Sequence, residues 1–195
     1  MILYLGIDPS RWKGEGKILH YPVIRTELIE WKEPVDWTLA THLLFTSRSA
    51  VQHWRQFDKQ ILTIGNATAQ LLKEQGLECL IAPEATQEGV IALLETLDLT
   101  GAYLIWPRSE RARNNVALYL EKRKVRFLAI DLYRTLFQKL EPVPSLDKID
   151  EIVFTSPSTV DAFLEIYGTL PANKKLTPIG PITKKYLGSA PIFSL

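Results

Sequence analysis

Phe154-Thr155-Ser156-Pro157-Ser158-Thr159-Val160 repeats an earlier stretch, Phe45-Thr46-Ser47-Arg48-Ser49-Ala50-Val51, with differences only at the fourth and sixth positions. Each copy is followed by a second shared signature, Ile64-Gly65-Asn66-Ala67-Thr68 after the first and Ile179-Gly180-Pro181-Ile182-Thr183 after the second. Two signatures in the same order indicate a duplicated unit. The period is far too long for a solenoid, so we expect two related lobes that face a shared cleft.

Each copy is typical of a strand that ends in a tight turn and is followed by a helix, because small hydroxyl residues succeed an apolar run. The first turn of a helix leaves about four N–H groups unpaired, and hydroxyl side chains satisfy some of them. The remaining N–H groups and the helix dipole favour anions. Ser158, with Asp161 three residues later, predicts a capping box. Such hydroxyls also cap helices in proteins that bind nothing, so a purely structural role stays open.

The length of 195 residues allows one large domain or two small ones. A hydrophobic fraction of 46% is ordinary for a globular protein, and no run approaches the roughly 18 apolar residues of a membrane span. The N-terminus has neither the basic segment nor the cleavage site of a signal peptide. The single cysteine, Cys79, excludes an internal disulfide and fits a reducing compartment. We therefore expect a cytoplasmic protein, and we expect it to be a monomer.

The net charge of +1 argues against a nucleic-acid-binding protein that relies on a broad basic face. Basic residues are densest between positions 108 and 126, where part of the stretch is expected to form a solvated helix face. His20, His42 and His53 have no metal-ligand spacing with one another or with Cys79. We expect no metal, no nucleic acid and no membrane as partners.

Strand and helix patterns alternate from His42 onward. Strands are predicted at 42–46, 60–64, 78–82, 103–106 and 125–132, and helices after Ser49, over 66–75, from Thr86, and from Ser109 to Lys122. This alternation predicts an α/β fold with parallel, doubly wound sheets. Ligands of such sheets bind beyond the carboxyl ends of the strands. The candidate binding residues at these ends are Thr46, Ser47, Ser49, Gly65, Thr68, Thr86 and Ser109 in the first lobe, and Thr155, Ser156, Ser158, Gly180 and Thr183 in the second.

The second copy of the duplicated unit is short, since the sequence runs only to Leu195 after Gly180. We expect the N-terminal segment to supply a strand to it, which makes that lobe discontinuous. The predicted terminal lobe is 1–24 plus 137–195, and the predicted central lobe is 25–132. Linkers are predicted near 21–26 and 132–136, and the stretch 133–150, with its prolines and without a helical period, is expected to cross between the lobes.

In this order and spacing the motifs resemble those of the uroporphyrinogen-III synthase family. The resemblance runs from about His42 to Leu187, and the first forty residues match only in general pattern. Besides the two repeated signatures it is carried by Ala82-Pro83-Glu84-Ala85-Thr86-Gln87-Glu88-Gly89, Trp106-Pro107-Arg108-Ser109 and Leu132-Tyr133-Arg134-Thr135. It implies two α/β lobes joined by a two-stranded linker, with the active site in the cleft between them. It also implies cyclisation of hydroxymethylbilane with inversion of the last pyrrole ring, without a cofactor.

The resemblance also implies site residues. Tyr133 corresponds to the family tyrosine proposed to help the terminal hydroxyl of the substrate leave, and a phenol of pKa about 10 can act as a general acid. The substrate is a polycarboxylate, which helix N-termini can bind without a strongly basic protein. Arg108 could clamp one carboxylate in bidentate fashion. Structural roles stay open for both residues, Tyr133 as a packed linker residue and Arg108 as a surface residue.

The chain departs from the family pattern at two places. Some members carry an arginine near the end of the first strand, where Asp8 stands here; Arg11 could take its place. The usual last strand and helix are missing after Leu187, which puts the completeness of the terminal lobe in doubt.

Two other classes of protein stay open. One is a two-lobed binding module that closes on an acidic small molecule without chemistry. The other is a phosphate- or nucleotide-binding protein, which is weakened because neither G-x-x-x-x-G-K-[ST] nor G-x-G-x-x-G occurs.

Overall fold

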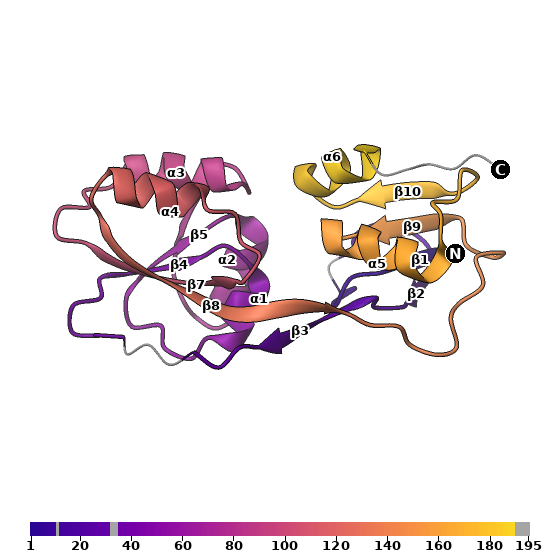
Figure 1. The fold of residues 1–195 in the computed structure, drawn as a ribbon, viewed down its shortest axis with the longest axis horizontal. Helices are drawn as coiled ribbons and strands as arrows, with labels where there is room; N and C mark the ends of the chain where they lie inside the picture. Colours follow the sequence, from indigo (N-terminus) through magenta and orange to yellow (C-terminus); the bar gives the residue numbers. More distant parts are fainter. Residues whose placement is uncertain (11, 32–34, 190–195) are drawn as a thin grey trace. The chain divides into compact units, whose positions relative to one another are not determined.

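The computed structural model describes residues 1–10, 12–31 and 35–189. The chain divides into two compact units (Figure 1). The terminal unit comprises Met1–Arg25 and Thr135–Leu195, and the central unit comprises Thr26–Arg134. Each unit contains a largely or wholly parallel sheet with helices packed on it, so the predicted α/β fold class is confirmed.

The central unit is built on a six-stranded sheet of order β3-β8-β7-β4-β5-β6. Its strands are β3 Ile24–Leu28, β4 His42–Phe45, β5 Gln60–Thr63, β6 Leu80–Ile81, β7 Tyr103–Ser109 and β8 Arg126–Phe137. All neighbouring pairs from β8 to β6 are parallel. The backbone bonds from Ile29 N–H to Leu132 and from Gln138 N–H to Val23 continue the β3–β8 pairing in the antiparallel sense. These two strands form the two-stranded link that crosses the division between the units.

Both faces of the central sheet are covered by helices, α1 Arg48–His53, α2 Asn66–Lys73, α3 Gln87–Glu95 and α4 Asn115–Lys122 (Figure 1). Successive strand residues point to opposite faces. Phe45 is therefore in one core with Val51 of α1, whereas Leu44 is in another with Val90 of α3. Since both faces are buried, β4 is apolar along its length after His42, as is typical of parallel sheets.

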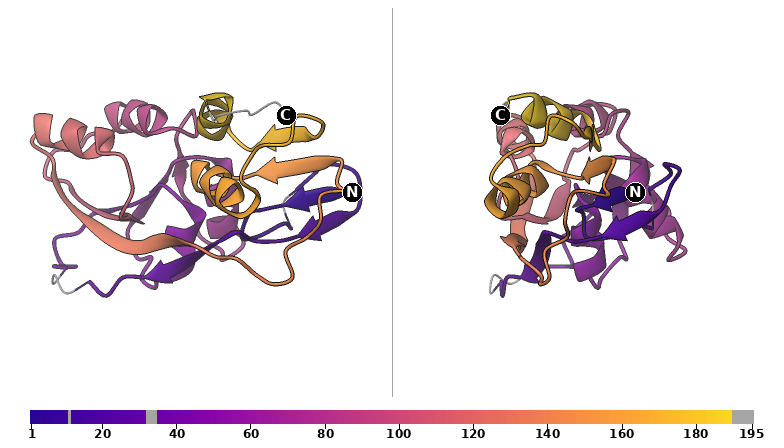
Figure 2. Two further views of the ribbon diagram at one scale, coloured as in Figure 1. Left: turned by 45° about the vertical axis from the view of Figure 1, so that its right-hand side comes forward. Right: turned by 90° about the vertical axis from the view of Figure 1, so that its right-hand side faces the viewer.

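The terminal unit has a four-stranded, wholly parallel sheet of order β10-β9-β1-β2. Its elements are β1 Ile2–Tyr4, β2 Ile18–His20, β9 Glu151–Phe154, α5 Pro157–Tyr167, β10 Lys175–Pro178 and α6 Pro181–Ser189. The N-terminal segment thus completes the sheet begun by β9 and β10. Figure 2 shows the ribbon of this unit in two further views. Phe154 packs edge-on against Phe163 of α5 at 5.5 Å, and Leu187 of α6 belongs to the same core. On the opposite face Trp12 packs against Ile2 and Val153.

The repeated stretch occupies the same topological position in both units. β4 lies between β5 and β7, and β9 lies between β10 and β1. In register, Phe45 pairs with Thr63 and Phe154 pairs with Pro178, so the second signature follows directly on the neighbouring strand in each case. The self-similarity of the sequence therefore corresponds to two copies of one β-α-β-α arrangement.

The predicted capping box of Ser158 and Asp161 is wrong. Helix α5 begins earlier, at Pro157, a residue whose fixed φ suits the first helical position. Its N-cap residue is Ser156, and the backbone N–H of Ser156 donates to Thr159 Oγ1 at 3.2 Å. Asp161 instead accepts a hydrogen bond from the Tyr186 hydroxyl at 2.6 Å.

The predicted helix cap at Ser109 is also wrong. Helix α4 begins only at Asn115, with Asn114 as its N-cap residue. Ser109 is the last residue of β7, because pairing with β8 continues through Pro107 as far as Ser109 opposite Tyr133. Strand β7 extends beyond the apolar residues of its sequence because β8, the strand that pairs with it, is long.

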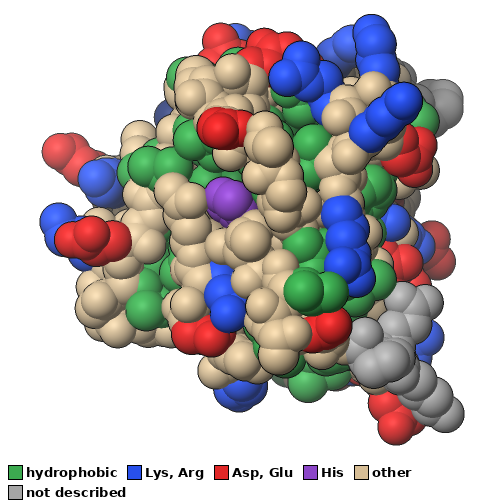
Figure 3. Space-filling model, turned by 90° about the vertical axis from the view of Figure 1, so that its left-hand side faces the viewer, with side chains coloured by type: hydrophobic (Ala, Val, Ile, Leu, Met, Phe, Trp, Pro, Cys, Tyr) green, Lys and Arg blue, Asp and Glu red, His purple; other side chains and the backbone are tan. Residues whose placement is uncertain are grey.

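On the face of the molecule drawn in Figure 3, acidic and basic side chains both lie among hydrophobic ones. Of the helices in the described ranges, none is both long and apolar enough to cross a membrane.

Candidate active site

The carboxyl ends of the central strands bring several predicted site residues to one edge of the sheet. Thr46 and Ser47 follow β4, Gly65 follows β5, and Ser109 ends β7 directly opposite Tyr133 in β8. This is the edge at which parallel α/β sheets bind their ligands.

Tyr133 lies at the centre of a group of hydroxyls. Its side chain is only 5% exposed, and its phenol donates a hydrogen bond to Ser47 Oγ at 2.8 Å. Burial raises the pKa of Tyr133, and hydrogen bonds with Ser47, Ser49 and Ser109 oppose that rise. We call these four residues the Tyr133 cluster. Since the pKa stays above its ordinary value, the phenol carries its proton at neutral pH.

Ser47 is held in place by helix α1, of which it is the N-cap residue. Its backbone is extended (φ −159°), and its Oγ accepts a hydrogen bond from the Ala50 N–H at 3.1 Å. Thr46, next to it, is tied to the core, because Trp106 Nε1 donates to Thr46 Oγ1 at 3.1 Å. Trp106 itself is fully buried. Hydrogen bonds to two consecutive hydroxyls, those of Thr46 and Ser47, therefore hold the turn after β4 in place.

Gly65, Thr68 and Thr86 define the beginnings of α2 and α3. Gly65 is the N-cap residue of α2, and a Cβ there would lie 3.0 Å from the Ala85 Cβ, so a side chain would crowd the neighbouring turn. Thr68 is 3% exposed in the first turn of α2. Thr86 caps α3 by accepting from the Gly89 N–H at 3.0 Å. The structure therefore gives the two threonines structural roles, which do not exclude contact with a ligand through the backbone.

The Arg108 side chain is already bound by other side chains of the protein. Its Nε donates to Asp131 at 2.8 Å and its Nη1 to Asn114 at 3.3 Å, while the guanidinium lies 4.9 Å from the centre of the Trp106 ring. The side chain is only 15% exposed. A bidentate clamp on a substrate carboxylate would have to displace these contacts.

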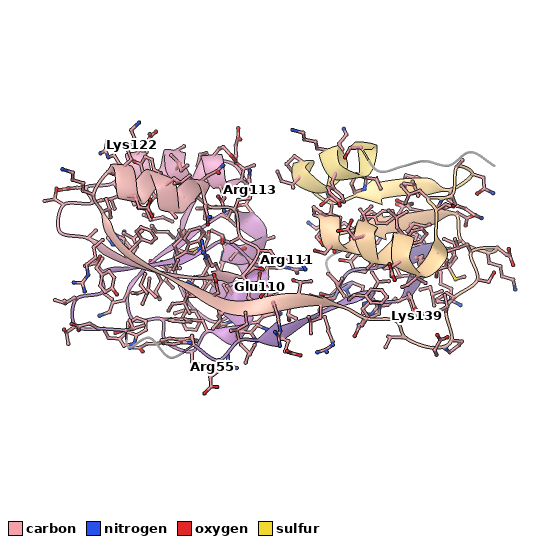
Figure 4. All side chains as sticks on the ribbon, viewed as in Figure 1. Arg55, Glu110, Arg111, Arg113, Lys122 and Lys139 are labelled. Carbon is pink, nitrogen blue, oxygen red and sulfur yellow. The ribbon has the colours of Figure 1, made fainter. Side chains whose placement is uncertain are left out.

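Arg111 is an exposed arginine near this edge that the sequence analysis did not single out as a site residue. It is exposed, and in the part of the chain that the structure describes its side chain has no ion pair or hydrogen bond. Its own N–H donates to Ser109 Oγ at 3.3 Å, which places it beside the Tyr133 cluster. Figure 4 shows Arg111 extending outward beyond this edge, whereas Lys122 stands at the far end of α4. Arg113, in contrast, pairs with Glu88 at 3.2 Å.

The predicted residues of the terminal unit also gather at the carboxyl ends of its strands. Thr155 and Ser156 follow β9, Ser158 lies in the first turn of α5, Gly180 precedes α6 with φ +81°, and Thr183 is buried within α6. Thr155 is packed against Gly6, whose added Cβ would lie 2.5 Å from the Thr155 methyl group.

Two details of the terminal unit bear on the departures from the family pattern. Asp8 Oδ1 accepts from the Ser10 N–H at 3.0 Å, so this carboxylate stabilises its own turn. Arg11, the suggested substitute for the family arginine, lies outside the described residues.

A groove of about 560 Å³ lies elsewhere, along the edge strand β6 and the outer face of α2. It is lined by Asn66, Ala69, Gln70, Lys73, Leu77, Glu78, Cys79 and Ile81. None of these is a predicted site residue, and burial raises the pKa of the Cys79 thiol, which makes it a poor nucleophile. The chemistry of the hydroxyl cluster, rather than the size of a groove, therefore identifies the candidate site.

A parallel α/β sheet with a buried phenol and serine hydroxyls at its carboxyl edge presents groups that can serve as a general acid, as expected for an enzyme. Comparisons with known proteins identify the family. The model of the family "HEM4: Uroporphyrinogen-III synthase HemD" matches residues 12–194. The chain therefore belongs to the uroporphyrinogen-III synthase family, whose members are lyases of tetrapyrrole biosynthesis. The predictions of an enzyme and of this family are confirmed.

Individual relatives agree with the family match. A protein of Methanothermobacter thermautotrophicus named "Putative uroporphyrinogen-III synthase" is 32% identical over 177 residues, covering 78% of this chain and 69% of the relative. The crystal structure of uroporphyrinogen-III synthetase from Helicobacter pylori superposes with a TM-score of 0.67 at 18% identity, covering 98% of this chain and 90% of that one. A mutant uroporphyrinogen III synthase from Thermus thermophilus gives 0.60 at 18% identity, with 96% and 87% covered. At this identity the solved structures support the fold.

Proposed function

We propose that this chain cyclises hydroxymethylbilane to uroporphyrinogen III, inverting the last pyrrole ring, with Tyr133 as the general acid. The observation that supports this role is the buried Tyr133 phenol, hydrogen-bonded to Ser47 at the carboxyl edge of the central sheet in a chain of this family. The proposal uses no cofactor. We propose that the protein has two domains, which are the terminal and central lobes predicted from the sequence.

The proposed reaction needs a general acid in one step, the departure of the terminal hydroxyl. When the terminal hydroxyl leaves the first ring, it departs more easily as water, and a delocalised cation remains. A phenol whose pKa is raised by burial is protonated and ready to donate. The cation is intrinsically reactive, so the remaining task is to hold the chain bent so that the substituted carbon of the last ring attacks first.

The carboxylates of the substrate require anion contacts spread around a large ring. In the proposal the backbone N–H groups at the helix starts supply them, near Ser47, Ser49, Gly65 and Thr86 in the central unit and near Thr155, Ser156, Ser158 and Gly180 in the terminal unit. Ser109 contributes from the end of β7. Thr46, Thr68 and Thr183 support these turns from the packed side. The net charge of +1 is compatible with this mode of binding, because backbone dipoles carry no net charge.

Arg111, and not Arg108, is proposed to hold a carboxylate through its guanidinium. Replacing Arg111 by alanine should raise the KM for hydroxymethylbilane about 10-fold and leave kcat nearly unchanged, since hydrogen bonds to charged groups are worth about 1.5–3 kcal/mol. Arg123→Ala is the matched control, because it removes the same exposed charge just past α4. Equal KM values for the two variants in steady-state assays would assign no binding role to Arg111.

The activity is tested directly by giving the purified chain hydroxymethylbilane and separating the products by chromatography. The type III isomer is expected, whereas spontaneous closure without enzyme gives the type I isomer. A product mixture identical to that of the enzyme-free reaction would refute the proposed function.

The second class considered, a binding module without chemistry, receives no support from the comparisons, all of which lead to one enzyme family. A cytoplasmic monomer is the form we propose, in keeping with the single free cysteine of the sequence. Light scattering after size-exclusion chromatography measures the oligomeric state.

A further inference from the structure

The Tyr133 phenol is enclosed, and its proton already has an acceptor. The residue is 5% exposed, and the phenolic O–H donates to Ser47 Oγ at 2.8 Å. In this arrangement the phenolic proton is directed to Ser47 and not out of the cluster. A hydrogen-bonded path from the phenol to the leaving hydroxyl would therefore begin at the acceptor of this proton.

Ser47 has the hydrogen-bonding pattern of an atom that connects the phenol with the leaving hydroxyl. A hydroxyl oxygen has two acceptor sites and one proton to donate. Ser47 Oγ accepts from the Tyr133 phenol and, at 3.1 Å, from the Ala50 N–H, so both acceptor sites are filled. Among the described residues no acceptor takes the Ser47 proton. Ser47 is also more exposed than Tyr133, so of the two hydroxyls it is the more accessible to a substrate.

We infer that Ser47 is a catalytic residue that relays the proton of Tyr133 to the leaving hydroxyl of the substrate. This inference rests on the proposed function. The C–O bond of the hydroxymethyl group breaks, and its electron pair leaves with the oxygen, which takes the Ser47 proton and departs as water. Ser47 Oγ takes the phenolic proton in the same step, and Tyr133 becomes a phenolate. When the closed ring loses a proton to restore its pyrrole, that proton returns to Tyr133 along the same path.

The rest of the cluster suits this cycle. Ser49 and Ser109 both oppose the rise in the pKa of Tyr133, so they favour its charged form. They come from the first turn of α1 and the end of β7. His53, whose ring centre lies 6.1 Å from that of Tyr133, has its pKa lowered by burial and is neutral at pH 7. His53 therefore provides no positive charge to stabilise the phenolate of Tyr133.

Two substitutions at Ser47 separate relay from helix capping. Asparagine caps a helix as well as serine but has no hydroxyl proton, whereas threonine caps and keeps the hydroxyl. If Ser47 relays the proton, Ser47→Asn should lower kcat about 10- to 100-fold at nearly unchanged KM, and Ser47→Thr should stay within a few-fold of the unchanged enzyme. Thermal unfolding of both variants confirms that α1 is intact, and kcat is measured as type III product formed from hydroxymethylbilane.

A double variant adds an independent readout. Tyr133→Phe together with Ser47→Asn should be no slower than Tyr133→Phe alone, because both changes interrupt one path. A Ser47→Asn variant with the kcat of the unchanged enzyme would overturn the relay, as would losses that multiply in the double variant or a threonine variant as slow as the asparagine variant at the same Tm. These outcomes would refute only the relay, provided that the unchanged chain forms the type III isomer. If the unchanged chain forms only the type I isomer, the proposed function itself is refuted.

Discussion

Replacing Tyr133 by phenylalanine should lower kcat for uroporphyrinogen III formation by about 10²-fold or more, within the range of about 10²–10⁴ for loss of a general acid. The substitution keeps the ring that is packed in the central core and removes only the phenolic oxygen. The fold should survive, since Ser47 Oγ still accepts from the Ala50 N–H. With the catalysed path slowed, spontaneous closure should raise the fraction of type I isomer in the product.

Tyr103→Phe is the matched control for this substitution. Tyr103 is also buried, at 7% exposed, but it begins β7 and so lies at the opposite edge of the same sheet. Its variant should retain the initial rate and the isomer ratio of the unchanged enzyme. Equal rates for Tyr103→Phe and Tyr133→Phe would show that Tyr133 is only a packing residue.

The pH dependence follows from the direction of the Tyr133 shift. Burial raises the pKa of this phenol above its ordinary value of about 10, so the acid form persists below that pH. Tyr133 should therefore cause no loss of kcat between pH 7 and about 9, and its deprotonation should reduce kcat only above about pH 10. This alkaline decline should be absent from the residual rate of Tyr133→Phe.

Phe45→Ala and Phe154→Ala should each destabilise the protein by about 3–5 kcal/mol, the usual cost of emptying a core position of this size. Both side chains are fully buried at equivalent positions of the repeated stretch. Phe45 packs 5.7 Å from Phe57, and Phe154 packs 5.5 Å from Phe163. The cavity left in either unit would be enclosed by strand and helix and could collapse only partly.

Denaturant unfolding followed by circular dichroism measures both losses, with separate transitions fitted if the units unfold independently. Leu118→Ala is the control, because Leu118 is 61% exposed on α4 and alanine favours a helix. Its unfolding free energy should change by no more than about 0.5 kcal/mol. A loss below about 1 kcal/mol for either phenylalanine would contradict its assignment to the core.

Local sequence was enough to predict that several candidate residues lie at the carboxyl ends of strands. Ser47 and Thr86 were expected at strand-to-helix turns, and both cap the helices that follow them. The two wrong caps, at Ser109 and Ser158, failed because helix and strand ends depend on partners distant in sequence. Ser109 stays in a strand because β8 pairs with it, and α5 begins at Pro157 because Thr159 can bind the Ser156 N–H.

The sequence by itself determined the duplicated β-α-β-α unit, the α/β class and the hydroxyl residues at the strand ends, since these follow from hydrophobic period and short-range hydrogen bonding. The sequence analysis predicted that the N-terminal segment adds a strand to the terminal lobe. Only the tertiary structure decided that both β1 and β2 join the sheet of β9 and β10. It also decided that Arg108 is held by Asp131 and Asn114, while the Arg111 side chain has no such partner among the described residues. It also decided that the Tyr133 phenol lies buried against Ser47, a contact between residues far apart in the chain. Burial and pairing of this kind are set by long-range packing, which no local pattern of residues records.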